Sequence, residues 1–227
     1  MTRIGPFLMT WALAVAAIPS ARATPERTPE RVTIDGRPVA VSAGQGAPPK
    51  RSAPAVPDPE RLRKRLGLTD EVSVYPTLLR DRTLVRTWRH NAQQRDESDL
   101  IDVAADGSRI TRRVLPFNDR GWVPAVCGDR WLVMALESDG SAVWDIEAMR
   151  LVAHIHVRGR FGNAESDGPA CSPDGKHAAL PTPYGGAVTI VRLADGVVVT
   201  DIPFDGPGTV RWTDQGITIW STFLPYE

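Results

Sequence analysis

Cys127 and Cys171 are the residues whose spacing first suggests chemistry, and they are the only cysteines of the chain. Each stands just before a turn that precedes a β-rich segment, and the two occupy matching positions in consecutive repeats. In an oxidising compartment such a pair can form a disulfide if its Cα atoms lie within about 7 Å of each other. The alternative is two small buried side chains in a slot usually filled by phenylalanine. The sequence leaves both alternatives open.

His154 and His156 form a second pattern that could do chemistry. Alternate residues of a strand point to the same side, so both imidazoles should lie on one face of a solvent-facing outer strand. A protein metal site normally needs a third ligand, and none stands close by in the sequence. We therefore predict no metal site and no cofactor. His90 and His177 stand alone, and we predict that they are surface residues or hydrogen-bonded polar residues.

Three aromatic residues in loop-like segments are the candidate contact residues for a partner, namely Trp122, Phe161 and Tyr184. Loops carry most of the binding function of β-rich scaffolds, and exposed aromatic side chains are frequent anchors. The alternative is packing between sheets, which is at least as strong an interpretation for Trp122 and a weaker one for Phe161, which lies beside glycine and charge. No nucleophile elbow, zinc-protease motif or phosphate loop is present, so we predict no catalytic residues.

Charge and composition narrow the class of protein. The chain has 27 basic and 27 acidic residues, and nucleic-acid binding requires clustered positive charge, so we predict no nucleic-acid partner. Hydrophobic residues make up 42% of the chain, which is enough for a packed core. The oligomeric state cannot be predicted from these features.

Residues 1–23 have the features of a secretory signal peptide. Arg3 precedes an apolar run from Phe7 to Ile18, Pro19 follows it, and Ala21-Arg22-Ala23 is a small-x-small cleavage site. The apolar run has about half of the ~20 residues that span a bilayer. We therefore predict cleavage, a periplasmic or secreted mature protein and no membrane span after cleavage. A buried core helix is the alternative.

Residues 24–71 are predicted to be a Pro-rich linker that contains a short hairpin and a short helix. Alternation around Asp35-Gly36 predicts the hairpin over residues 31–41. Asp58 can cap a helix that ends near Gly67, with Leu62 and Leu66 on one face and basic residues around them. We interpret this as a solvated helix docked by two leucines, and the alternative is a basic surface for an acidic partner or lipid headgroups.

Residues 72–227 consist of short β-rich runs separated by turns, and the pattern repeats. Turns before a strand recur at Asp81-Arg82, Asp129-Arg130, Asp174-Gly175 and Asp214-Gln215. A second turn follows each of the first three strands. Four short strands in about 40–50 residues is the signature of a propeller blade, whose two apolar faces must be covered by neighbouring blades. The predicted fold class is all-β, a β-propeller-like array of four-stranded antiparallel blades.

Several segments resemble bacterial WD-repeat-like propellers. The segment 171–180 (CSPDGKHAAL) resembles a blade opening, and 186–197 (GAVTIVRLADGV) resembles the strand and turn that follow. Trp144-Asp145 carries the Trp-Asp pair, and 210–217 resembles a further opening. The Gly-His pair of strict WD repeats is missing, so their buried polar network is not carried over. The resemblance implies a propeller fold and protein–protein contact, not a chemistry.

The repeats amount to about three and a half blades, whereas closed propellers usually need at least four. Three alternatives follow: a piece of a longer propeller, a closed ring in which the 31–42 hairpin supplies the missing outer strands, or pairing with another chain through the edge at Ile217–Phe223. The predicted function is an exported, non-catalytic scaffold for a protein partner. The alternative is a propeller-type enzyme, a lactonase or dehydrogenase-like subunit, with a site at the central mouth. Three or more inward carboxylates or histidines there would favour the enzyme.

Overall fold

A computed structural model describes residues 28–49, 56–93, 96–106, 110–116, 124–136, 140–156, 168–181, 186–204 and 208–221. The predicted signal peptide, residues 1–23, lies outside the described residues, as do the predicted contact residues Trp122, Phe161 and Tyr184. Within the described part, the single helix is too short to cross a membrane.

The described strands form four sheets, each with the four antiparallel or mixed strands of a blade-like unit, and the repeats predict this four-stranded unit. The first sheet has β3 (Ser73–Leu78), β4 (Arg82–His90), β5 (Asp96–Ala104) and β6 (Ile110–Val114). The second has β7 (Ala125–Cys127), β8 (Trp131–Leu136), β9 (Gly140–Asp145) and β10 (Arg150–Ile155). The third has β11 (Ala170–Cys171), β12 (His177–Pro181), β13 (Gly186–Arg192) and β14 (Val197–Phe204). Neighbouring strands within these three sheets are antiparallel.

The fourth sheet is assembled from both ends of the described chain. β15 (Gly208–Thr213) pairs with β16 (Gly216–Ser221), and the hairpin of β1 (Arg31–Ile34) and β2 (Arg37–Ala43) adds the outer two strands. β2 runs parallel to β16, with Ile217 opposite Val41 and Ile219 opposite Ala43. The hairpin therefore completes the last sheet, and β2 occupies the edge of β16 that could otherwise pair with another chain.

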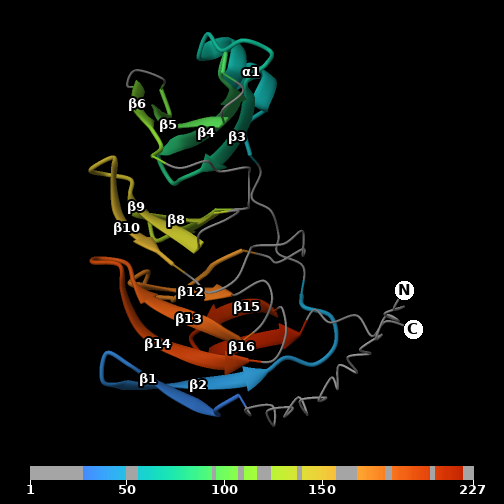
Figure 1. Cartoon of the computed structure of the whole chain (residues 1–227), viewed down its shortest axis with the longest axis vertical. Helices are drawn as coiled ribbons and strands as arrows, with labels where there is room; N and C mark the ends of the chain where they lie inside the picture. Colours follow the sequence, from blue (N-terminus) through green and yellow to red (C-terminus); the bar gives the residue numbers. More distant parts are fainter. Residues whose placement is uncertain are drawn as a thin grey trace, which may run out of the picture.

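The described sheets lie in a row rather than in a closed ring (Figure 1). Of the three alternatives from the sequence, the hairpin does supply the outer strands of the last sheet, but these four sheets do not close into a ring. The sheet β3–β6 lies at one end of the row, and the sheet with β1, β2, β15 and β16 lies at the other. One hydrophobic cluster fills each junction: Leu84 packs with Leu132 between the first two sheets, and Val143 with Leu180 between the next two. A third cluster joins Ile190 to the strands of the last sheet. Stacking therefore buries the apolar sides that a single sheet would expose.

Helix α1 (Pro59–Arg65) covers the end face of the first sheet. Asp58 caps it by accepting a hydrogen bond from the Glu60 amide, and Pro59 stands in its first turn. Leu62 is buried in a cluster with Val74 and Val85, and the partly buried Leu66 packs against the same cluster. The helix thus uses the leucine face expected from the sequence and shields one end of the row from water.

Candidate functional site

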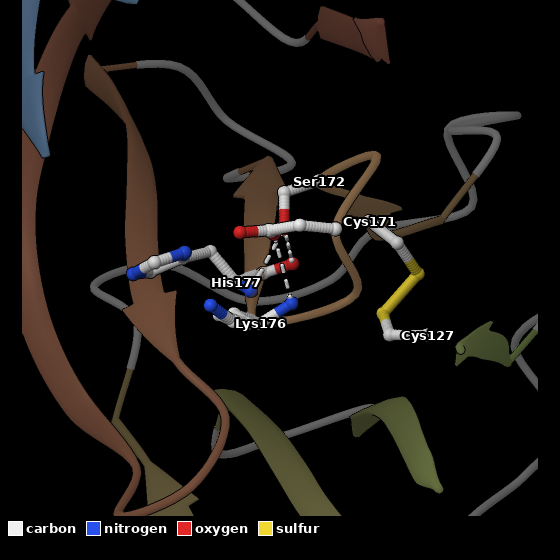
Figure 2. The surroundings of a disulfide bond; sticks show 6 residues. Cys127, Cys171, Ser172, Lys176 and His177 are labelled. Atoms are coloured by element: carbon white, nitrogen blue, oxygen red, sulfur yellow. Dashed lines mark hydrogen bonds between the residues drawn. A yellow bond between two sulfur atoms is a disulfide. The ribbon is translucent and has the colours of Figure 1, made fainter. Parts of the chain in front are cut away.

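A disulfide joins the inner strands of the second and third sheets. Cys127 ends β7 and Cys171 ends β11, and their sulfurs are bonded with the Cα atoms 5.2 Å apart (Figure 2). Cys127 is fully buried, and the pair packs beside Val133 and Ala178. The turns that follow the two strands are also in contact, since a Cβ on Gly175 would lie 3.2 Å from the Gly128 nitrogen. Of the two alternatives for the cysteines, the structure holds the disulfide.

The turn after Cys171 is held by its own side chains. The Ser172 hydroxyl donates to Asp174 Oδ1 at 2.7 Å and accepts from the His177 amide at 2.9 Å, and the Lys176 amide also donates to Asp174 (Figure 2). Burial raises the pKa of Asp174, but the hydrogen bonds from Ser172 and Lys176 outweigh it and leave that pKa below its ordinary value. The turn is therefore rigid and carries a carboxylate at neutral pH.

Asp35 fastens the β1–β2 hairpin to the third sheet. It lies in the hairpin turn with φ +47°, a left-handed conformation that aspartate tolerates better than most residues. Its Oδ2 lies 2.9 Å from His177 Nε2, and its Oδ1 accepts from Arg192 at 3.1 Å. His177 is 7% exposed, so this polar contact closes one side of a buried imidazole. Two residues of the third sheet thus hold one carboxylate of the fourth.

A cavity of about 620 Å³ opens where three turns meet. The β1–β2, β11–β12 and β15–β16 turns line it, and Trp212 forms an aromatic wall whose ring centroid lies 6.1 Å from that of His177. Its remaining charged side chains are Arg37, Asp174, Lys176 and Asp214. Among the described residues, the side chains of Arg37, Lys176 and Asp214 form no hydrogen bond or salt bridge, although the Lys176 charge acts on the nearby Asp174 carboxylate and helps to lower its pKa. The cavity therefore offers charges of both signs to a ligand.

The cavity lining includes three carboxylates and one histidine, but it lies between the third and fourth sheets and not at a central mouth, and the hydroxyl beside it is not arranged as a nucleophile. Ser172, His177 and Asp35 are the residue types of a catalytic triad, but the Ser172 hydroxyl bonds to the main chain of His177. The imidazole Nε2 faces Asp35 instead, so it does not act as a base toward this hydroxyl. Within the described ranges, no three His, Cys, Asp or Glu side chains are grouped so as to hold a metal ion.

The structure also places the isolated histidines and the histidine pair. His90 is exposed and His177 is a buried, hydrogen-bonded residue, as the sequence indicates. His154 is exposed on the outer strand β10, and His156, which is also exposed, directly follows the end of that strand; their ring centroids lie 4.6 Å apart. The three predicted contact aromatics cannot be placed relative to the cavity, because they lie outside the described residues.

Sequence reasoning missed the residues that shape the cavity. Asp35 stands out only as a turn residue, Asp214 only as part of a repeated turn, and Trp212 only as a strand residue. The repeated Asp-containing turns were the available signal, because stacked repeats place equivalent turns at the same end of the row. The sequence did not indicate that the β1–β2 turn lies beside these repeated turns.

The sequence matches no protein-family model, and no curated protein matches it.

Proposed function

We propose that this chain is an exported, non-catalytic binding module that engages a protein partner through the turn-lined end of its sheets. The observation that carries the proposal is the cavity between the three turns. Its walls are fixed by the Ser172 network and the Asp35 contacts, while the side chains of Arg37, Lys176 and Asp214 form no hydrogen bond or salt bridge with the described residues. A preformed wall lowers the entropy cost of binding, and unpaired charges are available to select a partner.

Export of the chain is part of this proposal. The first 23 residues carry the signal-peptide pattern, and the Cys127–Cys171 bond is of the kind that persists in oxidising compartments. We place the mature protein in the periplasm or outside the cell on these two observations.

We further infer that the sheets are degenerate WD-type blades. The 171–180 segment spans β11, its turn and the first part of β12, which is where a blade opening belongs. The Trp144-Asp145 pair ends β9, and Asp145 Oδ1 accepts a hydrogen bond from the Ala148 amide in the turn that follows. Blades of this kind serve as interaction scaffolds, which supports a binding role.

The test is a capture experiment with charge-reversed variants of the mature chain. Wild type, Lys176→Glu and the matched control Lys64→Glu are immobilised and exposed to envelope extracts of the producing cell, and bound proteins are quantified by mass spectrometry. Lys64 is exposed on α1, which packs on the first sheet, whereas the cavity lies between the third and fourth sheets, and Lys64 forms no ion pair with the described residues. A specific partner should bind to wild type and Lys64→Glu and be depleted at least fivefold on Lys176→Glu, since reversing a desolvated charge costs about 1 kcal/mol or more.

Two outcomes would contradict the proposal. One is that no protein is enriched on wild type over uncoated beads. The other is that Lys176→Glu retains the same proteins at the same level as Lys64→Glu. The same experiment with Phe161→Ala and Tyr184→Ala tests whether those loop aromatics contribute to the same partner.

A further inference from the structure

The disulfide reaches the wall of the cavity through one short stretch of chain. Cys171 is bonded to Cys127 and is followed directly by Ser172, the residue that organises the turn between β11 and β12 (Figure 2). Four residues of this stretch line the cavity, namely Ser172, Asp174, Lys176 and His177. A displacement of Cys171 therefore moves the first of these residues directly.

The strand that carries Cys171 is held by a short ladder within its own sheet. The described ladder between β11 and β12 has two residue pairs, Ala170 with Ala179 and Cys171 with Ala178. A ladder this short contains few hydrogen bonds, and segments with few hydrogen bonds open at a low cost in free energy. The covalent link to Cys127 on β7 is therefore a main fastening of β11.

The hydrogen bonds of the β11–β12 turn converge on Ser172. Its carbonyl oxygen accepts from the Gly175 amide at 2.9 Å, and its hydroxyl accepts from the His177 amide at 2.9 Å. The same hydroxyl donates to Asp174 Oδ1, which also accepts from the Lys176 amide at 3.1 Å. A shift of Ser172 therefore loosens the whole turn and changes the positions of Asp174 and Lys176 at the cavity.

We propose that the Cys127–Cys171 bond is a redox switch for the cavity. In the oxidised chain the bond holds the β11–β12 turn in its binding geometry, and reduction by a dithiol loosens the turn and weakens the binding of the protein partner. The effect on binding rests on the proposed function, whereas the loosening of the turn can be measured without a partner.

The exposure of the two cysteines decides which sulfur is attacked. Cys171 is partly exposed, whereas Cys127 is fully buried, so the thiolate of the reductant attacks the Cys171 sulfur. The bond to Cys127 breaks, the Cys127 sulfur leaves as a thiolate and takes up a proton, and a mixed disulfide forms on Cys171. The second thiol of the reductant then displaces Cys171, which is protonated in turn. Two electrons and two protons pass to the protein, and the reductant is released as a disulfide.

Amide hydrogen exchange tests the loosening of the turn. It is measured by NMR on the isotope-labelled mature chain before reduction, after reduction with dithiothreitol and after reoxidation. The amides of Gly175, Lys176 and His177 should exchange about tenfold faster in the reduced chain and return to the oxidised rate after reoxidation. The matched control is the Ala148 amide, which donates to Asp145 Oδ1 in a turn of the second sheet that contains neither cysteine, and its rate should stay the same. Unchanged exchange in the β11–β12 turn, or an equal rise at Ala148, would overturn the switch.

Capture from envelope extracts tests the effect on binding. Oxidised wild type, reduced wild type and Cys127→Ala/Cys171→Ala are immobilised, and the reductant is removed before the extract is added. The partner that oxidised wild type binds should be depleted about fivefold on both other samples and should return when the wild type is reoxidised. Equal capture by oxidised and reduced wild type would refute the switch and leave the proposed binding function intact. Capture of nothing by oxidised wild type would contradict the binding function itself, and the redox control of binding with it.

Discussion

Removal of the Cys127–Cys171 bond should lower the free energy of unfolding by about 4 kcal/mol. The bond closes a loop with a sequence separation of 44 residues, and the chain-entropy relation gives about 4 kcal/mol at 25 °C for a loop of that length. Domains of this size are stable by roughly 5–15 kcal/mol, so the loss is a large fraction of the total. The perturbation is the double variant Cys127→Ala/Cys171→Ala, because serine would bury a hydroxyl at the fully buried position 127.

Urea unfolding monitored by tryptophan fluorescence measures this effect on three samples: oxidised wild type, wild type reduced with dithiothreitol, and the double alanine variant. The first two differ only in the cross-link, and the variant also loses two packed sulfur atoms, so it should be the least stable of the three. Free energies extrapolated to zero urea are compared, since a cross-linked unfolded chain is more compact and changes the slope. Mass spectrometry of the unreduced protein checks the starting state. Equal stability of oxidised and reduced wild type, or two free thiols in the starting material, would refute the reasoning.

Three further predictions concern the hairpin, the acid limb of stability and the helix. Asp35→Asn keeps the left-handed turn but removes the negative charge that His177 and Arg192 contact, so it should lower the free energy of urea unfolding by about 1 kcal/mol. Asp214→Asn is the control and should leave this free energy unchanged. Equal losses in the two variants would contradict the role of the hairpin contact. Burial raises the pKa of Asp145, but the Ala148 amide and Arg130 outweigh it and hold that pKa below the ordinary value. The ionised Asp145 carboxylate therefore stabilises the folded state above about pH 3.9, and this stabilisation is lost as the pH falls through the lowered pKa. Asp145→Asn should therefore reduce the fall in melting temperature between neutral and acidic pH. An unchanged fall would contradict this. Leu62→Ala should lower the free energy of unfolding by about 2–4 kcal/mol, because it leaves a cavity in the cluster under α1. Leu78 is 47% exposed, so Leu78→Ala should lower it far less. Similar losses in the two variants would mean that the helix does not shield the first sheet.

The strands and turns could be predicted because they depend on near neighbours. Asp-containing turns mark the step from the first to the second strand of each sheet, as between β7 and β8, and alternation marks the strands on either side. The Asp58 cap and the paired leucines identify α1 in the same way. Each of these signals is contained within about ten residues, so the sequence alone is enough to read it.

The candidate sites were predicted only in part. The cysteines were recognisable as a candidate pair, but their bonding depends on how closely the inner strands of adjacent sheets approach. The histidine pair was recognisable from its spacing, and the structure adds that the two rings lie 4.6 Å apart. The cavity was not predicted, because its turns come from three separate parts of the chain.

By itself, the amino-acid sequence determines an all-β repeat with apolar strand faces that must be covered by stacking. The tertiary structure alone decides that β2 runs parallel to β16, that α1 covers one end of the row, and that Asp35 contacts His177 across 142 residues. Alternation of apolar and polar residues along a strand indicates that its apolar face must be covered, but it does not indicate which segment covers it. That choice is made by the packing free energy of the whole chain, in which distant segments compete for the same face.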